Sequence, residues 1–348
     1  MKRKSFYIGN KVIGNGSVLI QSMSDIKTSH VRENIKLTED LAKRGLDLMR
    51  FSVLDREDAK ALHEIKESVS IPVIADIHFD STLAVEAILS GADKIRINPG
   101  NIPLSSLREI ISLCKERQIP IRIGVNSGSL NRYKGKGKDH IDDFFLALED
   151  TLQIFKEENF DLLVLSLKTS NPDLLFPLYQ RAYETYPYPL HIGLTEAGLL
   201  NQGLILSAIP LYQLLKEGIG DTIRISLASD RKEEVRACKT LLKAASRREK
   251  TPTLIVCPGC GRTLVEHKRI AEIIQEHLDF VDADIKVACM GCPVNGIGEA
   301  KDADFGITGS GVKDDFILFS HEKILLRGKE EDVLNRLFSL LESEIIHG

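Results

Sequence analysis

The chain has 348 residues, of which 43% are hydrophobic and 28% charged, and its formal net charge is −4. This is the composition of a globular protein of about two domains, and it excludes a strongly basic class, so we expect no nucleic-acid partner. No run approaches the roughly 18 apolar residues of a membrane span, so we expect a cytoplasmic protein without a membrane partner. Cytoplasmic thiols stay reduced, and the six cysteines therefore suggest metal binding or catalysis rather than disulfides.

The first two thirds of the chain alternate between strand-like and helix-like segments. Eight short β-rich runs are each followed by a segment of helical periodicity. The runs lie at 17–23, 46–53, 71–78, 92–99, 119–126, 160–168, 189–196 and 220–227. This alternation predicts a closed (β/α)8 barrel, with an open doubly wound sheet as the alternative. We assign residues 1–246 to this substrate-binding TIM-barrel domain and the polar segment 247–252 to a linker.

In residues 253–348 the strands and helices no longer alternate regularly, and the pattern predicts a small α+β domain. The expected elements are a strand at 253–257, a helix at 263–278, a strand at 285–290, a glycine-rich turn, two short strands near Ile317 and Lys323, and a helix at 330–346. The fold class expected for the whole chain is thus α/β, a TIM barrel followed by a small α+β domain.

Charged and polar side chains gather where the predicted barrel strands end. Alternate side chains of a strand point inward, and active sites of such barrels form at the carboxyl ends of the strands. In this register the predicted mouth holds Arg50, Asp76, His78, Arg96, Asn98, Arg122, Asn126, Lys168, Glu196, Arg224 and Ser226.

Four arginines and one lysine at this mouth outnumber the two carboxylates, Asp76 and Glu196. Buried like charges repel one another, and arginine binds phosphate through two parallel hydrogen bonds. The pattern therefore predicts a multiply charged anion such as a diphosphate, with an internal network of ion pairs as the alternative. Lys168 fits a phosphate contact but is also compatible with a Schiff-base lysine, and His78 alone is more typical of a core histidine.

Four of the cysteines form two CxxC pairs, Cys257-Pro-Gly-Cys260 and Cys289-Met-Gly-Cys292. A structural zinc site with four thiolates is one interpretation. The segment between the pairs is longer than the roughly 15–20 residues typical of zinc ribbons. The glycines after Cys292 leave backbone N–H groups free to approach sulfur, which favours an iron–sulfur cluster over zinc.

Six motif-bearing segments run through the chain, at 73–79, 94–102, 120–126, 190–198, 218–226 and 291–300. In content and order they resemble the 4-hydroxy-3-methylbut-2-enyl diphosphate synthase family of the non-mevalonate isoprenoid pathway, in its short bacterial form. The sequence departs from the family pattern at Leu206, Pro210 and Tyr212, whereas the cluster and arginine positions are all kept.

The resemblance implies the two-electron reductive opening and dehydration of 2-C-methyl-D-erythritol 2,4-cyclodiphosphate to 4-hydroxy-3-methylbut-2-enyl diphosphate. It implies a [4Fe–4S] cluster whose ligands do not include Cys289, and Glu196 and Glu299 as catalytic groups. The implied cluster ligands are Cys257, Cys260, Cys292 and Glu299. The implied substrate contacts are Arg50, His78, Arg96, Asn98, Arg122, Asn126, Lys168, Arg224 and Ser226.

The resemblance also implies a homodimer whose active site is shared between two chains. Because no dinucleotide-binding fingerprint occurs, we expect flavodoxin or ferredoxin as the electron donor. Two other functions stay open: a barrel aldolase or pterin-type synthase with a structural zinc domain, and a non-catalytic metal-binding module that contacts nucleic acid, which the net charge of −4 disfavours.

Overall fold

The computed structural model describes residues 2–77, 80–98, 102–126, 130, 133–300, 302–321 and 323–347. The chain forms two compact units, Met1–Arg248 and Glu249–Gly348, each with its own hydrophobic core. Within the described residues, no helix is long and apolar enough to cross a membrane.

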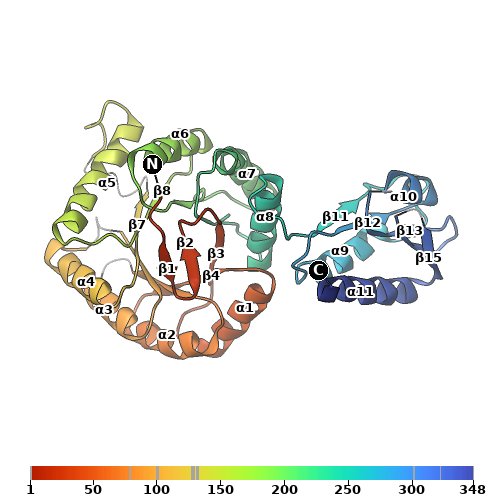
Figure 1. Ribbon diagram of the computed structural model, residues 1–348, viewed down its shortest axis with the longest axis horizontal. Helices are drawn as coiled ribbons and strands as arrows, with labels where there is room; N and C mark the ends of the chain where they lie inside the picture. The colour runs from red at the N-terminus through yellow and green to blue at the C-terminus, as the bar shows by residue number, and fades with distance from the viewer. Residues whose placement is uncertain are drawn as a thin grey trace. The chain divides into compact units, whose positions relative to one another are not determined.

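The first unit is a ring of strands enclosed by helices (Figure 1). Its strands are β3 (Leu19–Met23), β4 (Leu48–Val53), β5 (Val73–Ile77), β6 (Lys94–Ile97), β7 (Ile121–Asn126), β8 (Leu163–Lys168), β9 (His191–Ile192) and β10 (Thr222–Ile223). The sheet runs in the order β8-β7-β6-β5-β4-β3-β10-β9, with parallel neighbours throughout. A parallel bridge between Leu165 and Leu190 closes the ring, so the predicted (β/α)8 barrel is confirmed.

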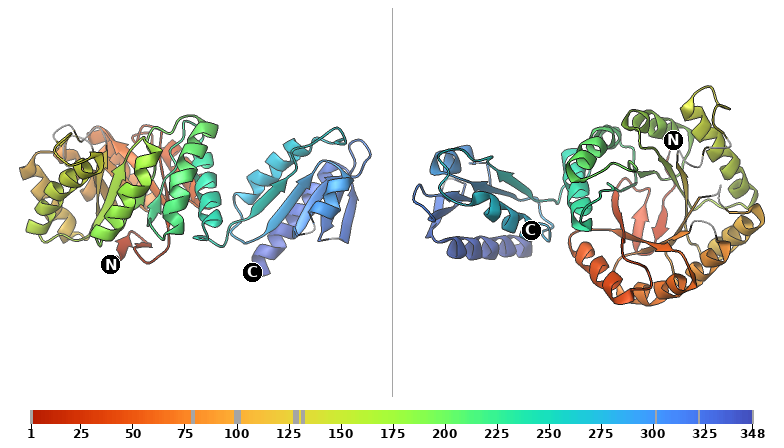
Figure 2. Two further views of the ribbon diagram at one scale, coloured as in Figure 1. Left: turned by 90° about the horizontal axis from the view of Figure 1, so that it is seen from above. Right: turned by 180° about the vertical axis from the view of Figure 1, so that it is seen from behind.

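Among the described residues, eight α-helices surround the strands (Figure 2). They are α1 (Val31–Lys43), α2 (Arg56–Ser68), α3 (Ser81–Leu89), α4 (Leu104–Glu116), α5 (His140–Glu157), α6 (Pro172–Thr185), α7 (Leu200–Lys216) and α8 (Arg231–Ala244). Several begin where the sequence supplies a cap: the carboxylates of Asp55 and Asp139 accept the backbone N–H of Asp58 and Asp142. Such caps satisfy N–H groups that a helix start leaves unpaired.

The last two barrel strands are shorter than the sequence predicts. Regular pairing stops after Ile192 and Ile223. The next residue, Gly193, passes so close to Arg224 that a Cβ there would lie 2.5 Å from the Arg224 carbonyl oxygen. Only a residue without a Cβ tolerates such an approach, which explains why glycine occupies this position.

An N-terminal hairpin that the sequence analysis missed covers one end of the barrel. It consists of β1 (Phe6–Ile8) and β2 (Lys11–Ile13), which pair antiparallel, and it lies in front of the barrel centre in Figure 1. Its Ile8 and Ile13 pack in one cluster with the inward residues Leu19, Leu48, Ile74 and Val164. These residues belong to the amino-terminal halves of the strands, so the hairpin seals that end and leaves the carboxyl end for a site.

The second unit is a five-stranded sheet with helices on both faces. Its elements are β11 (Thr253–Val256), α9 (His267–Leu278), β12 (Lys286–Met290), α10 (Pro293–Glu299), β13 (Phe305–Gly309), β14 (Phe316–Ser320), β15 (Lys323–Gly328) and α11 (Glu330–His347). The first three strands are parallel and the last two join antiparallel. Helices α9 and α11 share one core with the sheet, and a smaller cluster of Ala288, Met290, Ala300, Ala303 and Phe319 forms on the other face.

Two elements of this unit differ from the prediction. The segment expected as a glycine-rich turn is helix α10, and strand β13 was not expected. Pro293 sits at the start of the helix, a position that proline favours. Gly296 is needed for packing rather than for a turn, since a Cβ there would lie 2.4 Å from Thr308 Oγ1 of β13.

Candidate active site

A pocket of about 320 Å³ opens at the carboxyl ends of the barrel strands. Eight of the residues selected from the sequence line it: Arg50, Asp76, Arg96, Arg122, Lys168, Glu196, Arg224 and Ser226. Asn98 is buried after β6 but is not one of the lining residues. His78 lies outside the described residues, as do the side chains of Asn126 and Glu299.

Asp76 holds two of the arginines. Its Oδ2 lies 3.6 Å from Arg50 Nε, and its Oδ1 accepts a hydrogen bond of 3.1 Å from Arg96 Nη1. Arg50 also directs Nη2 at the sulfur of Met23, at 2.7 Å. Burial, opposed in part by Asp76, lowers the pKa of Arg50 to about 10. One carboxylate thus fixes the geometry of two guanidinium groups.

Glu234, a residue that the sequence analysis missed, holds Arg224. It is buried in the first turn of α8, and its Oε1 lies 3.3 Å from Arg224 Nη2. The same carboxylate accepts hydrogen bonds from Ser22 Oγ at 2.7 Å and from the backbone N–H of Leu227 at 3.1 Å. This network fixes Arg224 against the end of β10 and makes Glu234 a positioning residue.

Arg122 and Lys168 have no such counter-ion. Arg122 is 2% exposed, and among the described residues its Nε and Nη1 have no hydrogen-bond partner. Lys168 makes no ion pair within the described part of the chain, and burial together with the arginines lowers its pKa well below the usual value. Burial and the neighbouring Arg50 and Arg96 likewise lower the pKa of Arg122. Five cations of the pocket therefore face two lining carboxylates, Asp76 and Glu196, while Glu234 is shared between Arg224 and Arg231, so positive charge is in excess.

A second polar layer lies deeper in the barrel and was also missed. Lys94 is fully buried, and its Nζ lies 3.4 Å from Gln21 Oε1. His191 Nδ1 lies 2.7 Å from Thr222 Oγ1. Burial and then Arg122 and Arg50 lower the pKa of Lys94. The signal was present in the sequence, since Lys94 precedes Arg96 by two positions and must share its face of the strand.

Glu196 differs from the other lining carboxylate. It is exposed, makes no ion pair with any described residue, and has a φ of +56°, in the left-handed region. A non-glycine residue in that region stores strain of the kind that concentrates at functional sites. Its carboxylate is therefore available at the pocket for a ligand or a proton.

Three of the four paired cysteines gather at the carboxyl end of β11 and β12 in the second unit. The Gly291 N–H donates to Cys257 Sγ at 3.2 Å. The guanidinium of Arg262 bonds to both Cys260 and Cys292, and these thiols, Cys260 first, raise the pKa of Arg262. Cys257 is half-buried and Cys260 exposed, so both are accessible.

Cys289 points to the other face of the sheet. It packs in the core of α9 and α11, whereas Cys257 packs against the opposite cluster with Ala288 and Met290. Its Sγ donates to the His267 carbonyl oxygen at 3.2 Å, and burial raises its pKa to about 12. Within the described residues, no three His, Cys, Asp or Glu side chains are close enough together to hold a single metal ion.

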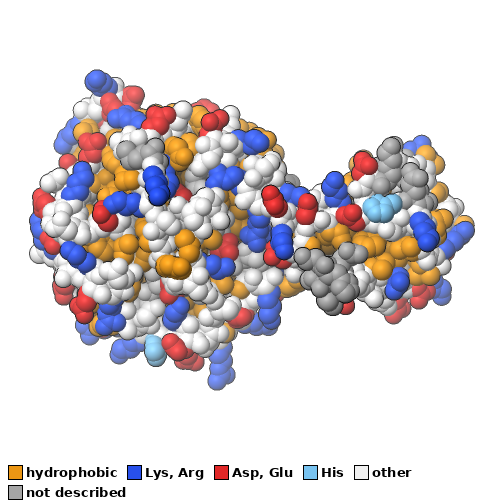
Figure 3. Space-filling model, viewed as in Figure 1, with side chains coloured by type: hydrophobic (Ala, Val, Ile, Leu, Met, Phe, Trp, Pro, Cys, Tyr) orange, Lys and Arg blue, Asp and Glu red, His pale blue; other side chains and the backbone are white. Residues whose placement is uncertain are grey.

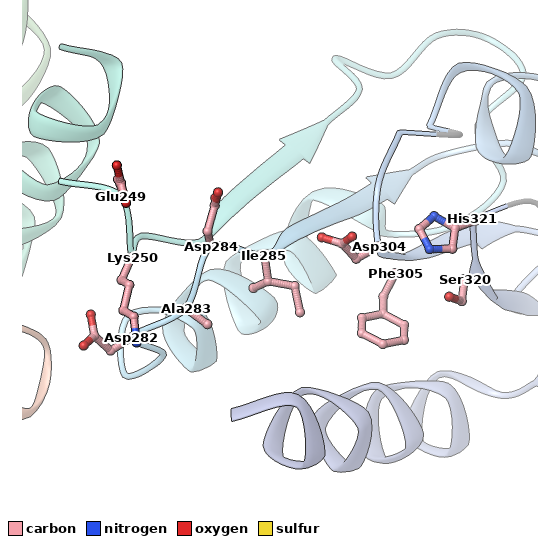
Figure 4. Close-up of a pocket in the computed structure, with 10 residues that line it drawn as sticks. All are labelled: Glu249, Lys250, Asp282, Ala283, Asp284, Ile285, Asp304, Phe305, Ser320 and His321. Atoms are coloured by element: carbon pink, nitrogen blue, oxygen red, sulfur yellow. The ribbon is translucent and has the colours of Figure 1, made fainter. Parts of the chain in front are cut away.

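A wider cavity of about 820 Å³ lies at the other end of this sheet (Figure 4). Its lining includes the carboxylates of Glu249, Asp282, Asp284 and Asp304. Asp304 accepts the backbone N–H of Lys286 at 2.8 Å, a contact that maintains the start of β12.

The space-filling view shows acidic and basic side chains interspersed over the hairpin face of the barrel (Figure 3), without a continuous basic surface.

These features define a two-unit protein, a (β/α)8 barrel with a cationic pocket joined to a small unit with two CxxC pairs. Family models match both units: the GcpE TIM-barrel domain matches residues 3–239 and the GcpE protein C-terminal domain matches 253–343. The chain belongs to the GcpE family.

The chain is similar over nearly its whole length to proteins named "4-hydroxy-3-methylbut-2-en-1-yl diphosphate synthase (flavodoxin)". The relative from Caldanaerobacter subterraneus is 41% identical over 97% of this chain and 96% of its own. The relative from Malacoplasma penetrans is 42% identical over 98% of this chain and 94% of its own.

Two solved structures share part of the fold of this chain. Dihydropteroate synthase from Xanthomonas albilineans has a TM-score of 0.53 at 13% identity, over 70% of this chain and 98% of its own. A type I 3-dehydroquinate dehydratase from Clostridium difficile has a TM-score of 0.52 at 16% identity, over 70% of this chain and 100% of its own. At these identities the matches support the fold only.

Proposed function

We propose that this protein reductively opens 2-C-methyl-D-erythritol 2,4-cyclodiphosphate and dehydrates it to 4-hydroxy-3-methylbut-2-enyl diphosphate. The full-length relatives are named for the product of this reaction, 4-hydroxy-3-methylbut-2-en-1-yl diphosphate, and for flavodoxin. The observation that carries the proposal is the barrel pocket, where five cations converge and Arg122 has no counter-ion among the described residues.

The charge of the pocket fits this substrate. Each phosphorus of a cyclic diphosphate carries one ionised oxygen, so the substrate brings two negative charges to a pocket whose positive charge is in excess around Arg122 and Lys168. Breaking the bond between carbon and the ring oxygen creates a further negative charge on that phosphate. Fixed cations in a water-poor pocket stabilise such a developing charge without having to reorganise. We assign the diphosphate to Arg50, His78, Arg96, Asn98, Arg122, Asn126, Lys168, Arg224 and Ser226.

The cysteine unit fits an iron–sulfur cluster, which we propose to be [4Fe–4S]. Cys257, Cys260 and Cys292 lie at one end of the sheet, a backbone N–H already points at the Cys257 sulfur, and Arg262 offsets thiolate charge. These three and Glu299 would hold the cluster. When bound, the cluster would pass the two electrons that the reaction consumes from the external donor to the substrate, one at a time. Cys289 stays outside the ligand set, because its side chain lies on the opposite face of the strand.

The remaining chemistry is proton transfer. The reaction consumes two electrons and two protons and releases one water, so a carboxylic acid near the departing hydroxyl is needed. We propose Glu196, which lines the pocket and is not engaged by the arginines, and Glu299 as the second catalytic group. The parenthesis in the relatives' name supports flavodoxin as the electron donor, with ferredoxin as the alternative.

We propose further that two chains share each active site in a homodimer. Arg247 donates to the carbonyl oxygens of Gly16 and Leu215, and Arg248 lies 3.8 Å from Asp47. These partners mark the amino-terminal end of the barrel strands, so the linker 247–252 leaves the barrel at the end opposite to the pocket. A two-fold dimer can place each cluster unit over the mouth of its partner.

Complementation tests the shared site. An Arg122→Ala chain keeps the cluster unit, and a Cys292→Ala chain keeps the barrel pocket. Mixing the two inactive chains with subunit exchange should restore part of the activity. No recovery after exchange proven by tag pull-down would mean that each chain closes on itself.

The reaction itself is tested with anaerobically purified protein. We expect about four iron and four sulfide per chain, a brown colour with absorption near 400 nm, and product formation from the cyclodiphosphate with reduced flavodoxin. A colourless zinc protein that turns over no cyclodiphosphate would instead support the aldolase or pterin-type synthase.

A further inference from the structure

His267 lies between the two CxxC pairs, at the first position of helix α9. The side chain is 4% exposed, and Nε2 lies 3.0 Å from the carbonyl oxygen of Cys257. A carbonyl oxygen can only accept a hydrogen bond, so Nε2 carries the hydrogen and donates it. The ring is therefore oriented by the peptide of a cysteine that the proposed function assigns as a ligand.

The His267 ring also leaves little room for a side chain at Gly259 or Gly291, the glycines that precede the second cysteine of each CxxC pair. A Cβ on Gly259 would lie 3.0 Å from His267 Cε1, and a Cβ on Gly291 would lie 3.1 Å from His267 Nδ1 and 2.7 Å from Thr263 Oγ1. Gly291 is the residue whose N–H donates to Cys257 Sγ. His267 thus contacts the carbonyl of Cys257 and also packs against the peptide that bonds to its sulfur.

Two other side chains hydrogen-bond to cysteine peptides. Thr263 Oγ1 accepts the N–H of Cys260 at 3.2 Å, and Thr308 Oγ1 donates to the carbonyl of Cys292 at 2.9 Å. His267, like Thr263, lies close to both pairs, but it alone of these three side chains bonds to Cys257, and its own carbonyl also accepts from Cys289 Sγ. His267 therefore supports two loops that come from separate strands.

We infer that His267 is a positioning residue for the cluster: it locks the Cys257 loop and holds the Gly291 N–H on the Cys257 sulfur. The inference rests on the proposed function, since it needs a cluster at this site. Partners that orient metal ligands typically contribute about 10–100-fold to metal affinity. A hydrogen bond to a ligand sulfur also stabilises the more negative, reduced cluster, so its loss lowers the reduction potential.

The experiment compares His267→Phe, which keeps a ring but removes the donor, with His267→Gln, whose amide N–H can replace Nε2–H. The control is His277→Gln, at the far end of the same helix, where the ring stacks on Phe338 at 4.2 Å. Iron and sulfide per chain are titrated under anaerobic reconstitution, and the midpoint potential is measured on the full-length protein. Circular dichroism of each apo-protein establishes that it is folded.

We expect His267→Phe to need about 10–100-fold more free iron for half-loading and to shift the potential to a lower value. His267→Gln should recover most of both, and His277→Gln should match the wild type. Wild-type loading and potential in His267→Phe would overturn the inference, as would equal losses in His267→Phe and His267→Gln if both fold. A wild-type protein that binds no cluster would instead overturn the proposed function.

Discussion

The barrel pocket is built from side chains that strands bury, whereas the cysteine site is built from residues that follow strands and range from the exposed Cys260 to the buried Cys292. Arg122 is 2% exposed at the centre of a closed ring of strands, while Cys260 is exposed on the loop after β11. A rigid ring can hold like charges together although they repel, because the covalent and packing framework opposes the repulsion. Thiols on loops remain open to a cofactor and to an electron donor. The barrel pocket is therefore suited to bind an anion, and the cysteine site is suited to hold a cofactor that delivers electrons.

The largest expected effect tests which cysteines belong to the second region. Cys292→Ser should lose nearly all iron and all activity, since serine replaces a thiolate ligand. Cys289→Ser is the matched control in the same CxxC pair, and it should keep both, because the Cys289 side chain lies in the core of α9 and α11. Iron content and turnover are measured together. Retention in Cys292→Ser with loss in Cys289→Ser would reverse the ligand assignment.

Removal of one pocket cation should give the next largest effect. Arg122→Ala removes the guanidinium that has no counter-ion among the described residues, so the substrate loses a charge-assisted contact of about 1.5–3 kcal/mol, or roughly ten- to hundredfold in kcat/KM. Arg108→Ala is the control, since Arg108 pairs with Glu157 on the surface at 2.6 Å. Iron content should stay normal in both variants. Unchanged kcat/KM in Arg122→Ala would separate the pocket from the reaction.

The free energy of unfolding gives a further test of the contrast between the barrel pocket and the cysteine site. A buried cation without a counter-ion, such as Lys168, helps to bind an anion but destabilises the ligand-free barrel. Lys168→Met should stabilise the ligand-free barrel by about 1 kcal/mol or more, since replacing buried charge by an apolar side chain of similar volume is often stabilising. The folded-state pKa of Lys168 lies well below 10.5, so the unfolded chain binds more protons between these two values. Wild-type stability should therefore rise with pH below 10.5, and the rise should be smaller in Lys168→Met. Calorimetry at two pH values checks this, and an identical pH dependence would contradict it.

The sequence predicted the residues that line the pocket better than the residues that hold them in place. Inward positions of a strand recur every second residue, so Arg50, Arg96 and Arg122 could be placed together from periodicity and the barrel rule. Glu234 could not, because a helix residue reaches the pocket only through the packing of α8 on the barrel. Lys94 lay within reach of the same rule as Arg96 but is deeper than the mouth.

The second unit shows the same limit. The two CxxC motifs were visible in the sequence. The face of the sheet on which each cysteine side chain lies was not, since it depends on which residues of β12 pack against α9. The glycines near Cys292 indicated a turn, while Gly296 is in fact small so that α10 can pack on Thr308. The hairpin had a local signal, Gly9-Asn10 between two apolar runs, which is typical of a two-residue turn.

The smallest expected effect asks whether the two regions respond independently to an anion. Inorganic pyrophosphate at ten times its dissociation constant should stabilise the barrel by about 1.4 kcal/mol, which for a unit of this size corresponds to roughly 3–6 °C in Tm. The shift should vanish in Arg122→Ala, persist in Arg108→Ala and fall with added salt, because the contacts are electrostatic. The cluster absorption should melt at an unchanged temperature, since the anion binds the barrel only. A shift of equal size in Arg122→Ala would mean that pyrophosphate binds elsewhere, and a parallel shift of the cluster transition would mean that the two units unfold as one.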